Sequence, residues 1–155
     1  MTEVGFYHLT RSNLEAALPR LLEKAYAAGH RVLVRGSDPE RLELLNRALW
    51  TYGKDTFLPH GGKGDGFAEQ QPIYLTVDLA NPNRATILTL VDGAQAPDLA
   101  SFDRCLDLFD GGDAEAVELA RKRWREVVEQ GHGAVYWQET ERGGWTRAAE
   151  RPPAG

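Results

Sequence analysis

Cysteine is almost absent from this sequence, which has one such residue, Cys105, in a chain of 155. A single thiol cannot form an internal disulfide or a thiolate zinc site, so we expect the core alone to stabilise the fold. A chain of this length can bury about two thirds of the surface that its unfolded form exposes. We therefore predict a single domain over residues 1–147 and a flexible tail over residues 148–155, and we interpret Cys105 as a small core residue.

Long apolar runs and an excess of basic residues are also missing. No stretch approaches the roughly 18 consecutive apolar residues of a membrane helix, and residues 1–10 lack the basic-then-apolar order of a signal peptide. These absences favour a cytoplasmic protein with no membrane partner. The 18 Lys and Arg residues are outnumbered by 23 Asp and Glu residues, for a formal net charge of −5. Proteins that grip phosphate backbones are usually basic, so direct nucleic-acid binding is disfavoured.

The motifs of common enzyme classes are missing as well. Residues 61–66 are rich in glycine, but Lys63 is followed by Gly64 and by no hydroxyl residue that could hold magnesium, so a P-loop is not formed. The sequence TRSN follows the first predicted strand, where a dinucleotide fingerprint would have to stand. The four histidines are scattered without metal-binding spacing, and Gly-x-Ser-x-Gly is absent. We expect no catalytic residue, cofactor or metal.

Short apolar segments typical of strands alternate with amphipathic segments typical of helices. Strands are predicted at residues 4–9, 31–36, 73–77, 85–91, 105–110 and 134–139, with a short extended piece at 56–60. Helices are predicted at residues 14–25, from 39 to about 50, and at 114–130. Because parallel strands need crossovers, which are usually helical, this alternation indicates an α/β fold with a parallel sheet. No further element is predicted after residue 141.

The starts of the first two helices carry recognisable signals. Ser12 and Glu15 have the spacing of a capping box, and Asp38 precedes a proline at the first helical position of the second helix. Pro19 lies inside the first helical pattern and removes a backbone donor there. We therefore expect that helix either to kink or to begin later than its capping signal.

The longest predicted helix carries a cluster of cations beside a tryptophan. Val117, Trp124 and Val128 belong to its apolar stripe, and Arg121 and Arg125 stand one turn apart beside Trp124. One interpretation is a core tryptophan flanked by solvated cations. The other is a peptide pocket in which the guanidinium groups hold carboxylates while the aromatic face receives an apolar side chain.

A second candidate surface follows the second helix. Trp50 ends the apolar pattern of that helix, and Phe57, Leu58 and Pro59 follow shortly after it. In one interpretation Trp50 completes the core beneath its helix. If the large side chains are exposed instead, they form an apolar patch of the kind that marks a partner interface.

Five segments together resemble a known family. They are FYHL near the N-terminus, GHRVLV before the second helix, ALW at its end, FLPH with a glycine-rich loop, and LARKRWR on the long helix. In this order and spacing, from about Phe6 to Trp145, the chain resembles the chi subunit of bacterial DNA polymerase III holoenzyme. The resemblance implies a single α/β domain with a mostly parallel central sheet, helices on both faces, and Rossmann-like topology without a phosphate-binding loop. It also implies a clamp-loader accessory protein without catalytic activity of its own, acting in DNA replication and repair.

The resemblance implies two binding faces. The acidic, phenylalanine-terminated tail of single-stranded-DNA-binding protein would bind Arg121, Trp124 and Arg125, with Val128 and Val117 beside them. The psi subunit of the clamp loader would bind Trp50, Phe57, Leu58 and Pro59, and a repair helicase could take its place there. Nucleic acid would be contacted only indirectly.

Two positions depart from the family pattern. Val117 stands where the family can carry a basic residue, and Trp124 where a tyrosine can occur; the segment after Trp145 is unmatched. Two alternatives also stay open. One is a small nucleotide-binding α/β enzyme that uses the loop at residues 61–66, and the other is direct binding of single-stranded DNA by residues 121–125.

Overall fold

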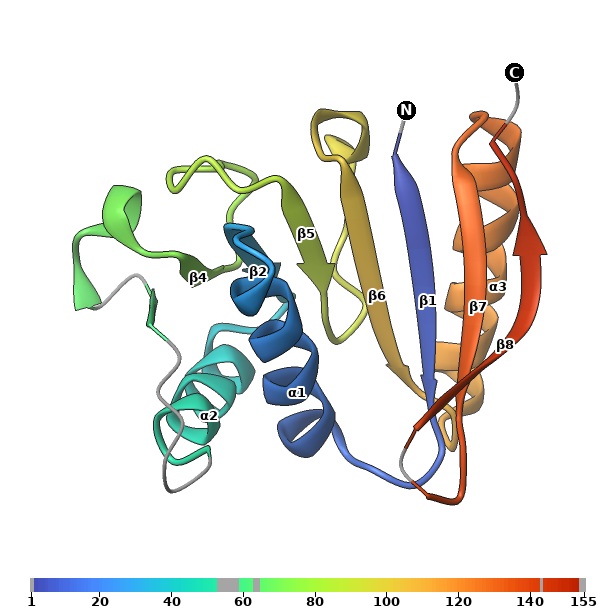
Figure 1. Ribbon diagram of the computed structural model, residues 1–155, viewed down its shortest axis with the longest axis horizontal. Helices are drawn as coiled ribbons and strands as arrows, with labels where there is room; N and C mark the ends of the chain where they lie inside the picture. Colours follow the sequence, from blue (N-terminus) through green and yellow to red (C-terminus); the bar gives the residue numbers. More distant parts are fainter. Residues whose placement is uncertain (1, 53–58, 63–64, 143, 154–155) are drawn as a thin grey trace.

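The computed structural model describes residues 2–52, 59–62, 65–142 and 144–153. Eight strands form one sheet with the spatial order β3-β4-β2-β5-β6-β1-β7-β8 (Figure 1). The strands are β1 (Glu3–Leu9), β2 (Val32–Arg35), β3 (His60–Gly62), β4 (Ile73–Thr76), β5 (Ile87–Leu90), β6 (Arg104–Asp110), β7 (Gly133–Glu139) and β8 (Trp145–Arg151). Neighbouring strands are parallel except for the β7–β8 pair, which is antiparallel. The predicted α/β fold with a mostly parallel sheet is confirmed.

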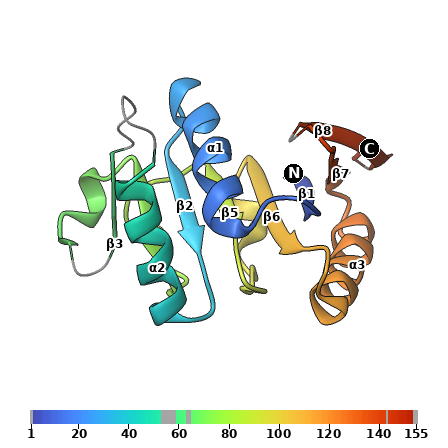
Figure 2. The same ribbon diagram turned by 90° about the horizontal axis from the view of Figure 1, so that it is seen from below.

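Three α-helices cover the two faces of the sheet. They are α1 (Leu14–Ala27), α2 (Pro39–Trp50) and α3 (Ala114–Glu129). Among the described residues, the short 3-10 turns η2 (Ala68–Gln70) and η3 (Leu99–Ser101) lie in the connections. Apolar residues of α1 and α2 pack with one side of the strands, and those of α3 pack with the other side. Figure 2 shows α3 near β1 and β7, away from α1 and α2. The sheet therefore separates the core into two layers, one beneath α1 and α2 and the other beneath α3.

Polar residues cap each helix at its N-terminus. Asn13, not Ser12, is the N-cap of α1, and its side chain accepts a hydrogen bond from the Ala16 amide. The capping box predicted at Ser12 is wrong because the Ser12 hydroxyl donates instead to the Glu139 carboxylate, at 2.5 Å. Asp38 caps α2 as predicted, and Asp113 caps α3. Helix α1 begins at Leu14 and continues through Pro19, so the late start considered for it does not occur.

Strand β8 has no counterpart in the predicted elements. It pairs with β7 from Glu139 opposite Trp145 to Ala134 opposite Arg151, with one irregularity in the register. The half-buried Trp145 ring meets the Tyr7 ring edge-on at 5.1 Å, and the rest of β8 is exposed. Periodicity therefore could not reveal this strand, because pairing with β7 and contacts of Trp145 and Arg147 with aromatic rings hold it in place.

The connections of β1 and β6 leave the sheet in opposite directions. From β1 the chain passes through α1 to β2 on one side, and from β6 it passes through α3 to β7 on the other side. Because β1 and β6 are neighbours, their carboxyl ends flank a topological switch point. In open α/β sheets this crevice is the usual place for a ligand, so it is considered below beside the two surfaces predicted from the sequence.

Candidate functional site

One edge of α3 carries the five residues predicted to bind an acidic peptide. Ala120 and Val127 turn toward the sheet and are buried. Along the adjacent edge, Val117, Trp124 and Val128 are half-buried and pack against the same core, while Arg121 and Arg125 are exposed. The helical repeat brings these five residues together as one surface, the α3 surface, as the sequence pattern predicted.

Trp124 is both a core residue and a surface residue. Its ring lies 5.6 Å from the Phe6 ring and 6.3 Å from the Tyr136 ring, measured between centroids. Tilted aromatic pairs at this separation stabilise a ring in one position beyond the effect of burial. The indole is therefore fixed against the core, as the first interpretation of Trp124 requires, and its remaining exposed part lies on the same edge of α3 as Val117 and Val128.

Arg121 is exposed on α3 and its charge reaches two residues of the sheet. Its guanidinium forms an ion pair of 3.3 Å with Glu118, one turn earlier, and 63% of its side chain is exposed. Burial lowers the pKa of His8 on β1, and the Arg121 charge lowers that pKa further. Burial raises the pKa of Tyr136 on β7, and the same charge opposes that rise. The Arg121 charge therefore affects the pKa of one residue on β1 and of one residue on β7.

His8 and Tyr136 lie next to the α3 surface, on β1 and β7, and they were not predicted from the sequence. Both are half-buried, and the His8 Nδ1 atom is hydrogen-bonded to the Tyr136 hydroxyl. The two rings lie 5.7 Å apart. Strand alternation could have indicated this position for His8, because residues two apart share a face and Phe6 packs against Trp124. Nothing in the sequence links the segment at residue 8 with the one at residue 136.

The second predicted surface is only partly described. Trp50 is 54% exposed at the end of α2, and its ring lies 4.5 Å from the His60 ring. It does not complete the core beneath α2, because Leu42, Leu45 and Leu49 fill that position. Pro59 is half-buried, whereas Phe57 and Leu58 lie outside the described residues. In the part of this surface that the structure describes, the main apolar feature is therefore the exposed Trp50 side chain.

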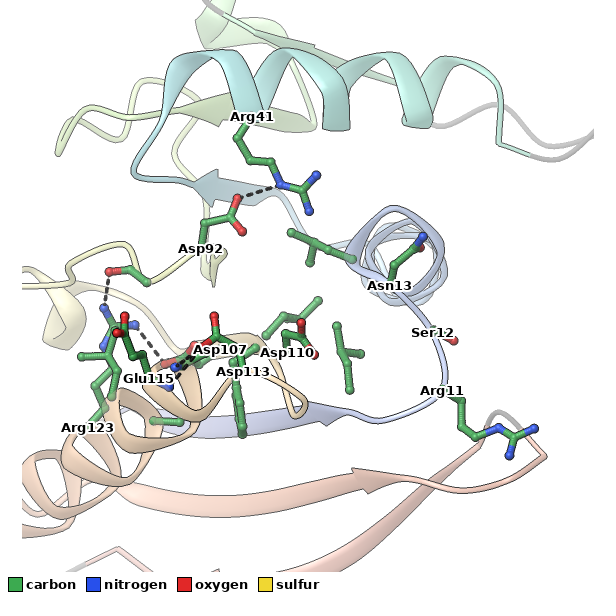
Figure 3. Close-up of a pocket in the computed structure, with 18 residues that line it drawn as sticks. Arg11, Ser12, Asn13, Arg41, Asp92, Asp107, Asp110, Asp113, Glu115 and Arg123 are labelled. Atoms are coloured by element: carbon green, nitrogen blue, oxygen red, sulfur yellow. Dashed lines mark hydrogen bonds and ion pairs between the residues drawn. The ribbon is translucent and has the colours of Figure 1, made fainter.

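A cavity of about 800 Å³ occupies the switch point at the carboxyl ends of β1 and β6 (Figure 3). The loop after β1, the turn after β6 and the first turn of α3 contribute polar residues to its wall. These residues include Arg11, Ser12, Asn13, Asp110, Asp113 and Glu115. Asp92, after β5, and Asp107, on β6, add two further carboxylates. The cavity is thus rich in acidic groups, which disfavour a phosphate ligand.

The backbone donors that a phosphate would use after β1 are already occupied. The amides of Arg11 and Ser12 each donate to Glu139 Oε1 at 2.8 Å, and the Thr10 amide donates to the same atom at 3.2 Å. The Glu139 side chain is fully buried on β7. Burial raises its pKa, but the hydrogen bonds from Ser12, Arg11 and Thr10 outweigh burial and lower that pKa overall. A carboxylate of the chain itself therefore occupies the amides after β1, and these amides are not available to a nucleotide phosphate.

The cationic cluster of α3 does not form one basic surface. Arg123 points inward, where it forms a 3.0 Å ion pair with the buried Asp107 and donates to the Gly93 carbonyl at 2.9 Å. Burial raises the pKa of Asp107, and Arg123 opposes that rise. The four cations of residues 121–125 are therefore split between the core and the surface, which weakens the case for direct DNA binding.

Two further comparisons concern metals and membranes. Across the described ranges, no three His, Cys, Asp or Glu side chains come close enough together to hold a metal ion. None of the helices in that part of the chain combines the length and the apolar character that a membrane crossing requires.

Cys105 is buried as predicted, and burial raises its thiol pKa, so it resembles a core residue more than a nucleophile.

Comparison with known proteins gives two matches. Residues 1–134 match the family described as DNA polymerase III chi subunit, HolC. A curated relative, probable DNA polymerase III subunit chi from Rickettsia prowazekii (strain Madrid E), is 37% identical over 109 residues. That alignment covers 70% of this chain and 66% of the relative, so the chain spans slightly less than two thirds of that protein's length. The family match includes all of α3 and ends at the start of β7.

Proposed function

The chain belongs to the family of DNA polymerase III chi subunits, replication accessory subunits, and we propose that it is a non-catalytic bridge between two proteins of the replication machinery. The α3 surface binds the acidic C-terminal tail of single-stranded-DNA-binding protein. The surface around Trp50 binds the psi subunit of the clamp loader. The observation that carries the proposal is the exposed guanidinium pair of Arg121 and Arg125 beside Trp124, whose ring packs on Phe6.

The α3 surface has the chemistry that an acidic tail ending in phenylalanine requires. Arg121 and Arg125 offer planar, permanently charged groups that bind carboxylates in a bidentate manner. Trp124, Val117 and Val128 supply a half-buried apolar wall for the terminal phenylalanine ring. Glu118, which pairs with Arg121 in the absence of ligand, is exposed and is readily exchanged for a tail carboxylate.

The strength of this contact follows from its size. A short peptide that combines one apolar side chain with a few charge-assisted hydrogen bonds is expected to bind with a Kd on the order of micromolar. The charges are exposed, so salt screens them, and the affinity falls as the ionic strength rises. Weak and salt-sensitive binding suits a subunit that must release its partner as replication advances.

The psi surface is proposed on the exposure of Trp50. A tryptophan that is 54% exposed buries a large apolar area when a partner covers it, and such residues dominate the energy of interfaces. We expect Trp50→Ala to lower psi binding at least tenfold in a co-purification or calorimetry assay, with no effect on tail-peptide binding.

The tail site is tested by fluorescence anisotropy with a labelled acidic peptide that ends in phenylalanine. We expect Arg121→Ala, and removal of the terminal phenylalanine, each to weaken binding at least tenfold. Lys122→Ala is the matched control, because Lys122 is an exposed cation of the same helix that points about 100° away from Arg121. Equal losses in Arg121→Ala and Lys122→Ala would reduce the contact to nonspecific charge attraction. A labelled oligo(dT) tested beside the peptide separates this proposal from direct DNA binding.

A further inference from the structure

His8 lies at the floor of the α3 surface, among groups from three other elements. Its Nδ1 atom is hydrogen-bonded to the Tyr136 hydroxyl of β7, and its ring lies 5.2 Å from the Phe109 ring of β6. Arg121 of α3 and Asp110 at the end of β6 are the charged groups that act on the imidazole. A half-buried histidine in such a position can be protonated while the protein stays folded.

Burial and the Arg121 charge both favour the neutral form of the His8 imidazole while the site is empty. Burial lowers the pKa of His8 first, Arg121 lowers it further, and Asp110 acts in the opposite direction. When the neutral ring carries its proton on Nε2, Nδ1 is an acceptor and the Tyr136 hydroxyl donates the hydrogen bond between the two groups. In that tautomer the phenol O–H is directed at His8 and is not available to a ligand.

We propose that His8 and Tyr136 are further binding residues of the acidic-peptide site, and that binding of the peptide is coupled to the uptake of one proton from solvent by His8. This inference rests on the proposed function of the α3 surface. A peptide carboxylate on Arg121 offsets the guanidinium charge that disfavours the imidazolium form. In the imidazolium, Nδ1 carries a proton and donates to the Tyr136 oxygen, so the phenol keeps its proton and its O–H is free to donate a hydrogen bond to a peptide carboxylate.

The direction of the pH effect follows from this coupling. The peptide raises the pKa of His8 from its lowered value in the free protein, so the protonated protein binds the peptide more tightly. Affinity therefore rises as the pH falls through the interval between the pKa of His8 in the complex and its pKa in the free protein. Peptide carboxylates stay ionised above about pH 5.5, so the ligand itself does not titrate there.

The test is an anisotropy titration of the labelled acidic peptide between pH 5.5 and pH 8.5 at constant ionic strength. We expect wild-type affinity to be about five- to tenfold higher at the acid end. His8→Gln keeps a polar side chain that does not titrate, and His30, His60 and His132 remain in that variant. We therefore expect His8→Gln to show little pH dependence, and Tyr136→Phe to lose much of the gain at acid pH.

A second measurement uses the wild-type protein alone. The nuclear magnetic resonance signal of the His8 Hε1 proton reports its pKa, and we expect peptide to shift that pKa upward. If wild-type binding does not change with pH, or if His8→Gln keeps the full pH dependence, the inference about His8 is overturned and the tail site stands. If the peptide does not bind at either pH, the proposed function of the α3 surface is overturned.

Discussion

Replacement of Glu139 by glutamine tests how strongly the charge of this buried carboxylate stabilises the loop after β1. The substitution keeps the size of the side chain and removes its charge. Glu139 accepts two backbone hydrogen bonds at 2.8 Å and one from the Ser12 hydroxyl at 2.5 Å. A hydrogen bond to a charged group contributes roughly 1 kcal/mol more than a neutral one, so loss of the charge on the two short amide bonds costs about 2 kcal/mol.

The assay is urea unfolding, with melting temperature as a second readout. For a chain of this length, about 2 kcal/mol lowers Tm by about 4–8 °C. Glu139→Ala leaves buried amides without an acceptor, so we expect it to cost about 3 kcal/mol or more. Glu141→Gln is the matched control, since Glu141 is an exposed residue two positions further on, and we expect its effect to stay within about 0.5 kcal/mol.

The pH dependence of the difference in stability between wild type and Glu139→Gln provides a test that could refute this reasoning. The pKa of Glu139 is lowered in the folded protein, so its charge adds stability at pH values above the ordinary glutamate value. That stability is lost as the pH falls through the lowered pKa of the folded state. The gap between wild type and Glu139→Gln should therefore narrow at acid pH. Equal stabilities at pH 7, or a gap that stays constant down to pH 3, would refute the reasoning.

Three further predictions concern stability. Asp107→Ala leaves Arg123 buried without its carboxylate and should cost about 3–5 kcal/mol in urea unfolding, more than Asp107→Asn. Gly111→Ala would place a Cβ atom 2.0 Å from His8 Nε2, so we expect it to lower Tm by several degrees and the His8→Ala change to relieve only part of the loss. Truncation before Trp145 uncovers the edge of β7 and removes the ring that packs on Tyr7, so we expect increased aggregation by light scattering.

Much of the fold could be predicted because its elements are encoded locally. The strand at Ile73–Thr76 and the helix at Ala114–Glu129 each bury a regular apolar pattern, and each was found within two residues of its bounds. The N-cap of α1 could not be identified from spacing, because the Ser12 hydroxyl donates a hydrogen bond to Glu139, which is 127 residues away in the sequence. Strand β8 was missed for a related reason, since its exposed residues follow no apolar alternation.

The candidate site was predictable only along α3. The helical repeat is enough to place Arg121, Trp124 and Val128 on one edge, whatever the rest of the fold. The floor beneath that edge is made by His8 and Tyr136, which are 128 residues apart in sequence and lie on neighbouring strands. Whether Trp50 faces the core or the solvent also depended on how α2 is rotated against the sheet, because Leu49 and Trp50 both continue its apolar pattern.

The place of β1 in the sheet has a consequence during synthesis of the protein. Among the described strands β1 is synthesised first, yet its register pairs Glu3 with Arg104 on one side and with Gly133 on the other. At about 5–20 residues per second, roughly 5–20 seconds pass before the first of these partners exists. Until then a strand rich in buried apolar residues has two open edges. Folding of this protein is therefore expected to be a late and concerted event, and a nascent chain stalled before residue 104 should be a good substrate for chaperones.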